Sequence, residues 1–239
     1  MDNNIKVPKD FKIEPKTELG KKLDNFWFYH KWKVIVGIFL VIAITVCTVQ
    51  CMSKEKTDVQ ILYAGGISSS NAISQDMKSA LSDIKPKELG ENGTGLTVLE
   101  LYSDKYVIEN QDKVNAYNNS QNYKDFCQLL TAGEYSLLIL DKWIYDDIKT
   151  SVGFRKITEV VGNDVVSDDA MYDDSAIYLK KTDFYLRYYG TFSKLPDDTV
   201  ICLCIYSPYK STVGCASQNS DSAYDASVEM FKAIVNYKG

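Results

Sequence analysis

Residues 34–49 of the chain read VIVGIFLVIAITVCTV and carry no charged side chain. Extended to Met52, this stretch makes a helix of about 28 Å at about 1.5 Å per residue, close to the roughly 30 Å of a bilayer's hydrocarbon core. Aromatic residues of the kind that sit at a membrane interface precede it: Phe26, Trp27, Phe28, Tyr29 and Trp32. Residues 34–52 are therefore predicted to form a transmembrane helix, with the lipid bilayer as its partner.

Three other interpretations of this stretch fit less well. A cleaved signal peptide would start near the N-terminus and end in a small-x-small site, whereas about 33 polar or mixed residues come first here. A lipoprotein signal would place small residues before its cysteine, but Cys47 follows Ile-Thr-Val and Cys51 follows Thr-Val-Gln. A buried core helix would show a polar face, and this stretch has none. We therefore expect an uncleaved signal anchor.

Lysines are more frequent on the N-terminal side of the stretch, where Lys16, Lys21, Lys22, Lys31 and Lys33 stand against Lys54 and Lys56 on the other side. The positive-inside rule then predicts a cytoplasmic N-terminus and an extracellular C-terminal domain in the cell membrane. The predicted parts are a cytoplasmic tail with an aromatic juxtamembrane segment (1–33), the transmembrane helix (34–52), a short linker (53–57) and an extracytoplasmic domain (58–239). We expect residues 1–25 to be largely disordered. Residues 19–31 fit either a short amphipathic interfacial helix or a plain linker.

The composition of the domain excludes several kinds of chemistry. From Ser53 onward, 19 Lys and Arg stand against 27 Asp and Glu, and an acidic surface of this kind repels nucleic acid. The one histidine, His30, lies at the membrane edge, so the domain has no Ser-His-Asp or Cys-His pair and no histidine for a metal site. We therefore expect no catalytic residues, no cofactor and no metal.

Four cysteines belong to the domain: Cys127, Cys202, Cys204 and Cys215. Cys202 and Cys204 are two residues apart in a predicted strand and share one of its faces, so they are not expected to bridge each other. Their spacing fits no common zinc pattern. Buried apolar thiols are the favoured interpretation, and a disulfide remains the alternative.

Short apolar runs alternate with helical patterns from residue 58 onward, which favours an α/β fold with a mainly parallel sheet between helices. Expected strands cover residues 59–64, 96–102, 135–140, 176–179 and 199–206. Expected helices cover residues 71–84, 123–132, 182–189 and 224–237, with Gly133 and Gly190 ending the second and third.

Several segments resemble known proteins. NFWFYHKWK (25–33), the apolar stretch, Cys51 and DVQILYAG (58–65) resemble uncharacterised single-pass membrane proteins of Gram-positive bacteria. FCQLLTAGEYSLLILD (126–141) and AIYLKKTDFY (176–185) are similar to parts of type 2 periplasmic solute-binding proteins. The resemblance implies a reduced version of that fold, because about 180 residues leave room for one lobe and only a small second one.

The first candidate binding segment follows the first expected strand. Gly65 and Gly66 let backbone approach a ligand, and Ser68, Ser69 and Ser70 precede a helix N-terminus, which favours an anion or a carboxylate. An ordinary glycine-rich turn with Ser70 or Asn71 as helix cap is the alternative. The segment matches neither a dinucleotide fingerprint nor a P-loop.

The second candidate segment follows the third expected strand. Asp141 with Trp143 and Tyr145 could hold a polar or cationic organic solute. The alternative is an aspartate that caps a helix, followed by apolar anchors. Tyr206 belongs to a group of tyrosines in the C-terminal half that suits either a partly wet contact surface or packing at the edge of the core.

An acidic run also raises the question of calcium. It comprises Asp164, Asp168, Asp169, Asp173 and Asp174, but the spacing matches no EF-hand and contains no closing glutamate. A solvated acidic loop is the favoured interpretation.

These features favour a membrane-tethered, extracytoplasmic, non-catalytic binding module for a small polar solute or a surface partner. The alternative is a structural or assembly subunit, or a sensor, of a membrane protein complex that acts through protein–protein contacts.

Membrane anchoring predicts two fractionation results. The full-length protein stays in the membrane pellet after extraction with alkaline carbonate, because about 19 apolar residues partition into lipid. Protease added to intact cells degrades the C-terminal domain and leaves a small protected fragment. Full-length protein in the carbonate supernatant, or a domain that resists protease until the cells are lysed, would contradict this topology.

Overall fold

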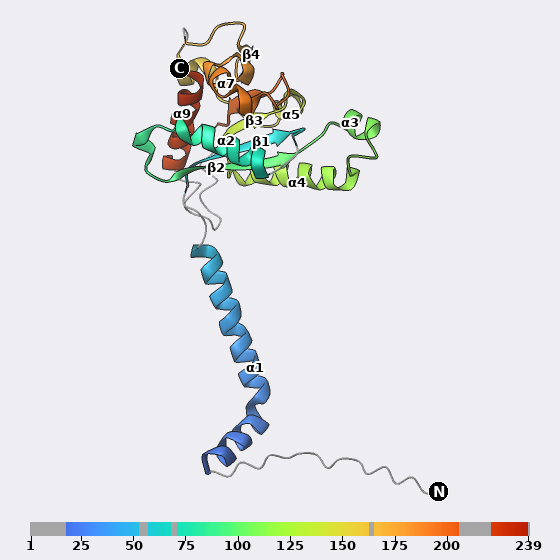
Figure 1. Ribbon diagram of the computed structural model, residues 1–239, viewed down its shortest axis with the longest axis vertical. Helices are drawn as coiled ribbons and strands as arrows, with labels where there is room; N and C mark the ends of the chain where they lie inside the picture. The colour runs from blue at the N-terminus through green and yellow to red at the C-terminus, as the bar shows by residue number, and fades with distance from the viewer. Residues whose placement is uncertain (1–17, 53–56, 68–70, 163–164, 206–220, 239) are drawn as a thin grey trace, which may run out of the picture. The chain divides into compact units, whose positions relative to one another are not determined.

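A computed structural model describes residues 18–52, 57–67, 71–162, 165–205 and 221–238. The chain forms two compact units, Met1–Glu55 and Lys56–Gly239, and Figure 1 shows the elements of each.

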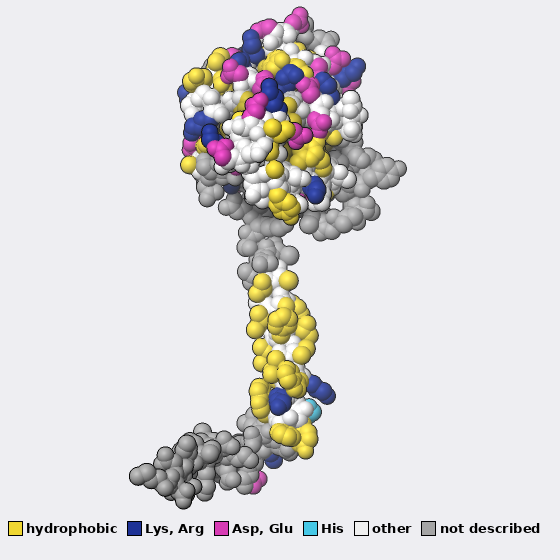
Figure 2. Space-filling view, turned by 90° about the vertical axis from the view of Figure 1, so that its right-hand side faces the viewer, with side chains coloured by type: hydrophobic (Ala, Val, Ile, Leu, Met, Phe, Trp, Pro, Cys, Tyr) yellow, Lys and Arg dark blue, Asp and Glu magenta, His cyan; other side chains and the backbone are white. Residues whose placement is uncertain are grey.

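The described residues of the first unit form one long helix, α1 (Glu18–Met52). Within it, the 23 residues Phe26–Thr48 are long and apolar enough to span a membrane; an 18-residue window of this span has a mean hydropathy of 2.0, and none of that window is buried inside the protein. The aromatic residues from Phe26 to Trp32 thus lie inside this window, which starts earlier than the predicted span of 34–52. Figure 2 shows hydrophobic side chains along α1, with lysine and histidine side chains near its N-terminal part.

The helix begins well before the apolar stretch. Residues 18–25 are helical, so the prediction of disorder is wrong for them, while residues 1–17 lie outside the described part of the chain. Residues 19–31 are helical and continuous with the rest of α1, and their position in a membrane interface stays a prediction. A helix that is already nucleated by the apolar stretch extends at little cost, because each added residue contributes one more backbone hydrogen bond.

A six-stranded sheet forms the centre of the second unit, in the order β2-β1-β3-β6-β5-β4. Its strands are β1 (Thr57–Gly65), β2 (Gly93–Glu100), β3 (Leu137–Leu140), β4 (Met171–Asp173), β5 (Ala176–Tyr178) and β6 (Val200–Leu203). β1 is parallel to both β2 and β3, but β6 is antiparallel to β3 and to β5, and β4 is antiparallel to β5. The sheet is therefore mixed, and the prediction of a mainly parallel sheet holds only for β2, β1 and β3.

The connection between β5 and β6 explains the antiparallel half. Tyr178 at the end of β5 pairs with Val200 at the start of β6, so the chain leaves β5 and enters β6 at the same end of the two strands. A parallel pair would need a connection that crosses from one edge to the other. The intervening helices are short: η2 (Leu179–Lys181), α7 (Asp183–Arg187) and α8 (Tyr189–Phe192). Gly190 lies within α8 and does not end the predicted helix of residues 182–189.

Helices cover both faces of the sheet. On one face, α2 (Asn71–Asp83), α7, α8 and α9 (Asp221–Val235) pack against alternate residues of β1 that include Ile61 and Tyr63. On the other face, α4 (Ala116–Ala132) and α5 (Lys142–Ile148) pack against Leu62 and Ala64. The remaining helices are η1 (Lys87–Leu89), α3 (Asp104–Glu109) and α6 (Ile157–Val161).

Local signals account for several boundaries. Asn115 caps α4 by accepting a hydrogen bond from the backbone N–H of Asn118, and Gly133 ends it with a left-handed φ of 67°, as predicted. Cys202 and Cys204 share a buried face of β6 and its extension, and both are thiols, as is the half-buried Cys127. Cys215 lies outside the described residues.

Candidate functional site

The strand order creates a topological switch point at the carboxyl ends of the parallel strands. From β1 the chain moves to β2 on one side, and then to β3 on the other side of β1. In open α/β sheets, ligands bind outside the carboxyl ends of strands at such a point. Gly65 ends β1, Tyr102 follows β2, and Asp141 follows β3, so these three positions lie together at the carboxyl ends of the three strands.

Asp141 lies between the ends of these strands, and its carboxylate is hydrogen-bonded to other groups of the protein. The side chain is buried, with 4% of its surface exposed. Its Oδ2 accepts a hydrogen bond from the backbone N–H of Gly66 (2.8 Å), and its Oδ1 accepts from the hydroxyls of Tyr63 (3.1 Å) and Thr199 (3.3 Å). We call these four residues the Asp141 network. It joins the ends of β1 and β3 to the start of β6.

Gly65 makes room for the Asp141 network. A Cβ atom at this position would lie 2.3 Å from Asp141 Oδ1 and 2.4 Å from the Tyr63 hydroxyl, so the carboxylate occupies the place of a side chain. At Gly66 a Cβ would lie 3.3 Å from the ring of Tyr102, which packs over it. The two glycines therefore allow a close approach by protein side chains.

The pKa of Asp141 is raised, mainly because burial disfavours the charged carboxylate, with a further contribution from the charge of Asp198. The hydrogen bonds from Gly66, Tyr63 and Thr199 act in the opposite direction. Burial also raises the pKa of Tyr63, which therefore stays a neutral donor. Asp141 occupies the N-cap position of α5 but makes no side-chain capping bond, because its carboxylate turns towards Gly66.

A pocket opens beside this network, at the carboxyl ends of β2 and β3. Its volume is about 460 Å³, within the range of small-molecule sites. Three aromatic side chains, two carboxylates and two small polar side chains line most of it: Tyr102, Tyr123, Trp143, Asp104, Asp147, Asn119 and Ser120. We call it the aromatic pocket. Trp143, one of the predicted site residues, is half-buried in its wall.

Hydrogen bonds from α4 hold the loop after β2 against the pocket. The amide of Asn119 accepts from the backbone N–H of Tyr102 and donates to its carbonyl, both at 2.9 Å. Asn122 donates to the carbonyl of Glu100 at 2.9 Å. Tyr102 also stacks on Tyr106, with ring centroids 4.8 Å apart. The amide of Asn119 is thus used to position the loop and to orient the ring of Tyr102.

Both tyrosine hydroxyls of the aromatic pocket donate to carboxylates. Tyr102 donates to Glu100 at 2.8 Å, and burial together with this hydrogen bond raises its pKa to about 12. Tyr123 donates to Asp147, and its pKa is raised by burial and by this bond. Both rings are therefore neutral at physiological pH.

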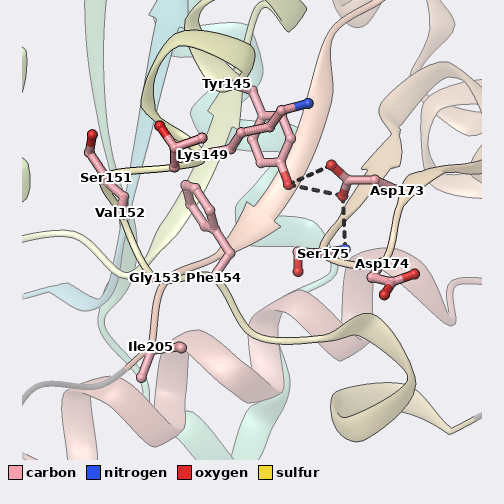
Figure 3. A pocket seen from close by; sticks show the side chains of 11 residues that line it. Tyr145, Lys149, Ser151, Val152, Gly153, Phe154, Asp173, Asp174, Ser175 and Ile205 are labelled. Carbon is pink, nitrogen blue, oxygen red and sulfur yellow. Dashed lines mark hydrogen bonds between the residues drawn. The ribbon is translucent and has the colours of Figure 1, made fainter.

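The short helix α5 faces a second hollow with its other side (Figure 3). This hollow has a volume of about 570 Å³ and is lined by Tyr145, Lys149, Phe154 and Ile205, among others. Two carboxylates line it: Asp174 is exposed, and Asp173 accepts from the Tyr145 hydroxyl at 2.9 and 3.0 Å and from the Ser175 backbone N–H at 2.9 Å. Its lysine is paired with Asp146 at 2.7 Å. Because Asp173 and Lys149 are engaged and the aromatic pocket is the more enclosed of the two, we place the candidate site at the aromatic pocket.

The other predicted site residues are not all brought together. Ser68, Ser69, Ser70 and Tyr206 lie outside the described residues. Ile205, the residue before Tyr206, follows β6, which runs antiparallel to β3. Ile205 therefore lies at the opposite end of the strands from Asp141. Ligand binding by Gly65, Gly66, Asp141 and Trp143 stays a prediction.

The acidic run of residues 164–174 is spread over different contacts. Asp169 pairs with Lys181 at 3.0 Å, whereas Asp173 binds Tyr145. Asp168 and Asp174 are exposed, and Asp164 is outside the described residues. Within the described ranges, no group of three His, Cys, Asp or Glu side chains is placed to hold a metal ion.

Sequence reasoning missed Tyr102, Asn119, Tyr123 and Asp147. One signal was readable: Trp143 and Asp147 are four residues apart, which places them on one face of a helix. The contributions of α4 depend on how it packs against the sheet, and no local pattern gives that. Comparisons with protein-family models, with curated proteins and with solved structures find no match to this chain.

Gly65→Ala is expected to destabilise the domain by roughly 1–3 kcal/mol, because the new methyl group collides with the Asp141 carboxylate. Gly93→Ala at the start of β2 is the matched control, since no atom lies within 4 Å of its Cβ position. Denaturant unfolding of both variants measures the difference. Equal effects at the two glycines would contradict the close packing of Asp141 on Gly65.

Asp141→Asn is expected to keep or raise stability at pH 7. The amide oxygen can accept from Gly66, and the amide N–H can donate to hydroxyls that also accept. Because the pKa of Asp141 is raised in the folded state, the folded state binds more protons than the unfolded state between the ordinary pKa of 3.8 and the raised pKa. The unfolding free energy of the native protein therefore falls as the pH rises through this interval. In unfolding curves at several pH values this dependence disappears in D141N. A D141N protein that is less stable at pH 7 by more than about 2 kcal/mol would argue against this account.

Proposed function

We propose that this chain is a membrane-anchored, extracytoplasmic binding module and not an enzyme. Its α1 helix anchors it with a cytoplasmic N-terminus, and its domain binds a small polar solute in the aromatic pocket. The domain corresponds to a reduced form of the type 2 solute-binding fold that the sequence resembles. The apolar window Phe26–Thr48 supports the anchor.

The aromatic pocket is the observation that carries this proposal. It lies next to the switch point of the sheet, it has the volume of a small-molecule site, and its walls are preorganised by the hydrogen bonds of Asn119 and Asn122. Preorganised aromatic walls lower the entropic cost of binding, because their side chains are ordered before the ligand arrives.

A non-catalytic role agrees with the chemistry of the pocket wall. Its hydroxyl groups from tyrosine are held neutral by their raised pKa, and its carboxylates are exposed. The Tyr123 hydroxyl does contact a carboxylate, Asp147, but its raised pKa opposes the deprotonation that a nucleophile needs.

An assembly or sensor role in a membrane complex is the second candidate function. Exposed apolar side chains on α3 and at the start of α4 favour it: Tyr106, Ile108 and Tyr117 have 43%, 67% and 71% of their surface exposed. Aromatic residues are enriched in protein interfaces. Crosslinking of Tyr117 to another membrane protein, with no thermal shift by any solute, would favour this candidate over solute binding.

Solute binding can be read directly from Trp143. The chain has three tryptophans, and Trp27→Phe with Trp32→Phe leaves Trp143 as the only one. In the full chain in detergent micelles, a ligand from a library of polar solutes is expected to shift its emission and to raise the melting temperature. A solute at about 100 times its Kd stabilises by about 2.7 kcal/mol.

The control for this experiment is an aromatic residue elsewhere. Trp143→Ala is expected to weaken binding by about tenfold or more, measured by calorimetry, because an aromatic wall contributes a large buried area. Tyr189→Ala, on the opposite face of the sheet and 60% exposed, should leave it unchanged. A library in which no solute moves either signal would count against the proposed function.

A further inference from the structure

We infer that the aromatic pocket selects an organic cation that carries an ammonium group. This inference rests on the proposed function, since it names the class of solute that the pocket binds. It depends on the charge, the donors and the ring faces that the described residues present.

The charge around the pocket has one sign. Asp104 and Asp147 line it and are exposed at its surface, while none of the described residues that line it is lysine or arginine. Asp104 lies in the first turn of α3, and Asp147 lies on α5. The two carboxylates thus come from different elements and face one volume. A cation in this volume gains attraction from both, whereas an anion is repelled by both.

The nearby lysines of α5 are directed elsewhere. Lys142 and Lys149 both pair with Asp146, which lies on a different side of the helix from Trp143 and Asp147. Lys142 also lies 4.8 Å from the ring centroid of Tyr172, away from the aromatic pocket. These pairs leave the carboxylate of Asp147 without a lysine partner among the described residues.

Three hydrogen-bond donors of the pocket are already committed, and the Ser120 hydroxyl and the Trp143 indole N–H are the other donors among its lining side chains. Tyr102 donates its hydroxyl proton to Glu100, and Tyr123 donates its hydroxyl proton to Asp147. The Asn119 amide is held by the backbone of Tyr102. An anionic or carbonyl-rich solute needs donors, and three of the five donor side chains in the lining are occupied. A cation needs acceptors and ring faces, which remain.

Three ring systems line the pocket, and one of them, Tyr102, has one face already stacked on Tyr106. Tyr102, Tyr123 and Trp143 line the pocket together, from the loop after β2, from α4 and from α5. Aromatic faces attract ammonium groups, and indole does so most strongly. Because Tyr102 and Tyr123 stay neutral, the attraction comes from their ring electrons and holds over a wide pH range.

Three compounds of one branched shape test the sign of the charge. They are choline, the neutral 3,3-dimethylbutan-1-ol and the anion 3,3-dimethylbutanoate. Each is titrated into the full chain with Trp143 as its only tryptophan, at constant ionic strength. Choline is expected to bind at least about tenfold more tightly than either analogue. Its charge does not change with pH, so protonation of the probe cannot alter the result.

Charge variants locate the effect. Asp147→Asn and Asp104→Asn are each expected to weaken choline binding about fivefold or more, and added salt should weaken it further in the native protein. Asp125→Asn on α4 is the matched control, because it removes the same charge from an exposed position outside the pocket lining. Should loss of the Tyr123 contact unfold D147N, the D104N variant, whose side chain forms no ion pair among the described residues, carries the test.

The outcomes separate the class of ligand from the function. Binding of the alcohol or of the anion at Trp143 as tightly as choline overturns the cation class and leaves the proposed function standing. If the three probes are silent and a library solute binds at Trp143, its charge and its response to D104N decide the class. A domain that binds no solute at all overturns both proposals.

Discussion

The carboxylate of Asp141 fills the space that a side chain at position 65 would occupy. Its hydrogen bonds join the ends of β1 and β3 to the start of β6. A buried charge or polar group is costly unless it is satisfied, and this one receives donors from a backbone N–H and two hydroxyls. Those donors come from the end of β1 and from the start of β6, the two strands on either side of β3. Trp143 follows two residues later, so the position of the pocket wall depends on the same contacts.

Much of the fold could be predicted because local patterns report local structure. The apolar runs that became β1 and β6, the helix that ends at Gly133, and the shared face of Cys202 and Cys204 all follow from periodicity or from a glycine that can adopt positive φ. The direction of the strands could not be predicted, because it depends on the end of the sheet at which the chain enters the next strand. β4 is three residues long, too short for an alternating pattern to stand out.

The candidate site shows the same division between local and distant information. Gly65, Gly66 and Asp141 do meet, as the order of strands and loops implies, but glycines and a carboxylate look alike in sequence whether they approach a ligand or each other. Tyr102 and Tyr123 became wall residues through packing between α4 and the loop after β2. That packing joins residues about twenty positions apart through an asparagine, a pairing that no spacing rule identifies.

Every side of α5 has a different neighbour. Ile144 and Ile148 face the core, Trp143 and Asp147 the aromatic pocket, Tyr145 and Lys149 the second hollow, and Lys142 pairs with Asp146. Each pair is four residues apart, and each residue turns the helix by about 100°. Deleting a single residue would rotate all four sides at once and exchange their surroundings. A change in the length of this segment therefore disturbs four sets of contacts together, whereas a substitution of one exposed residue disturbs only one of them.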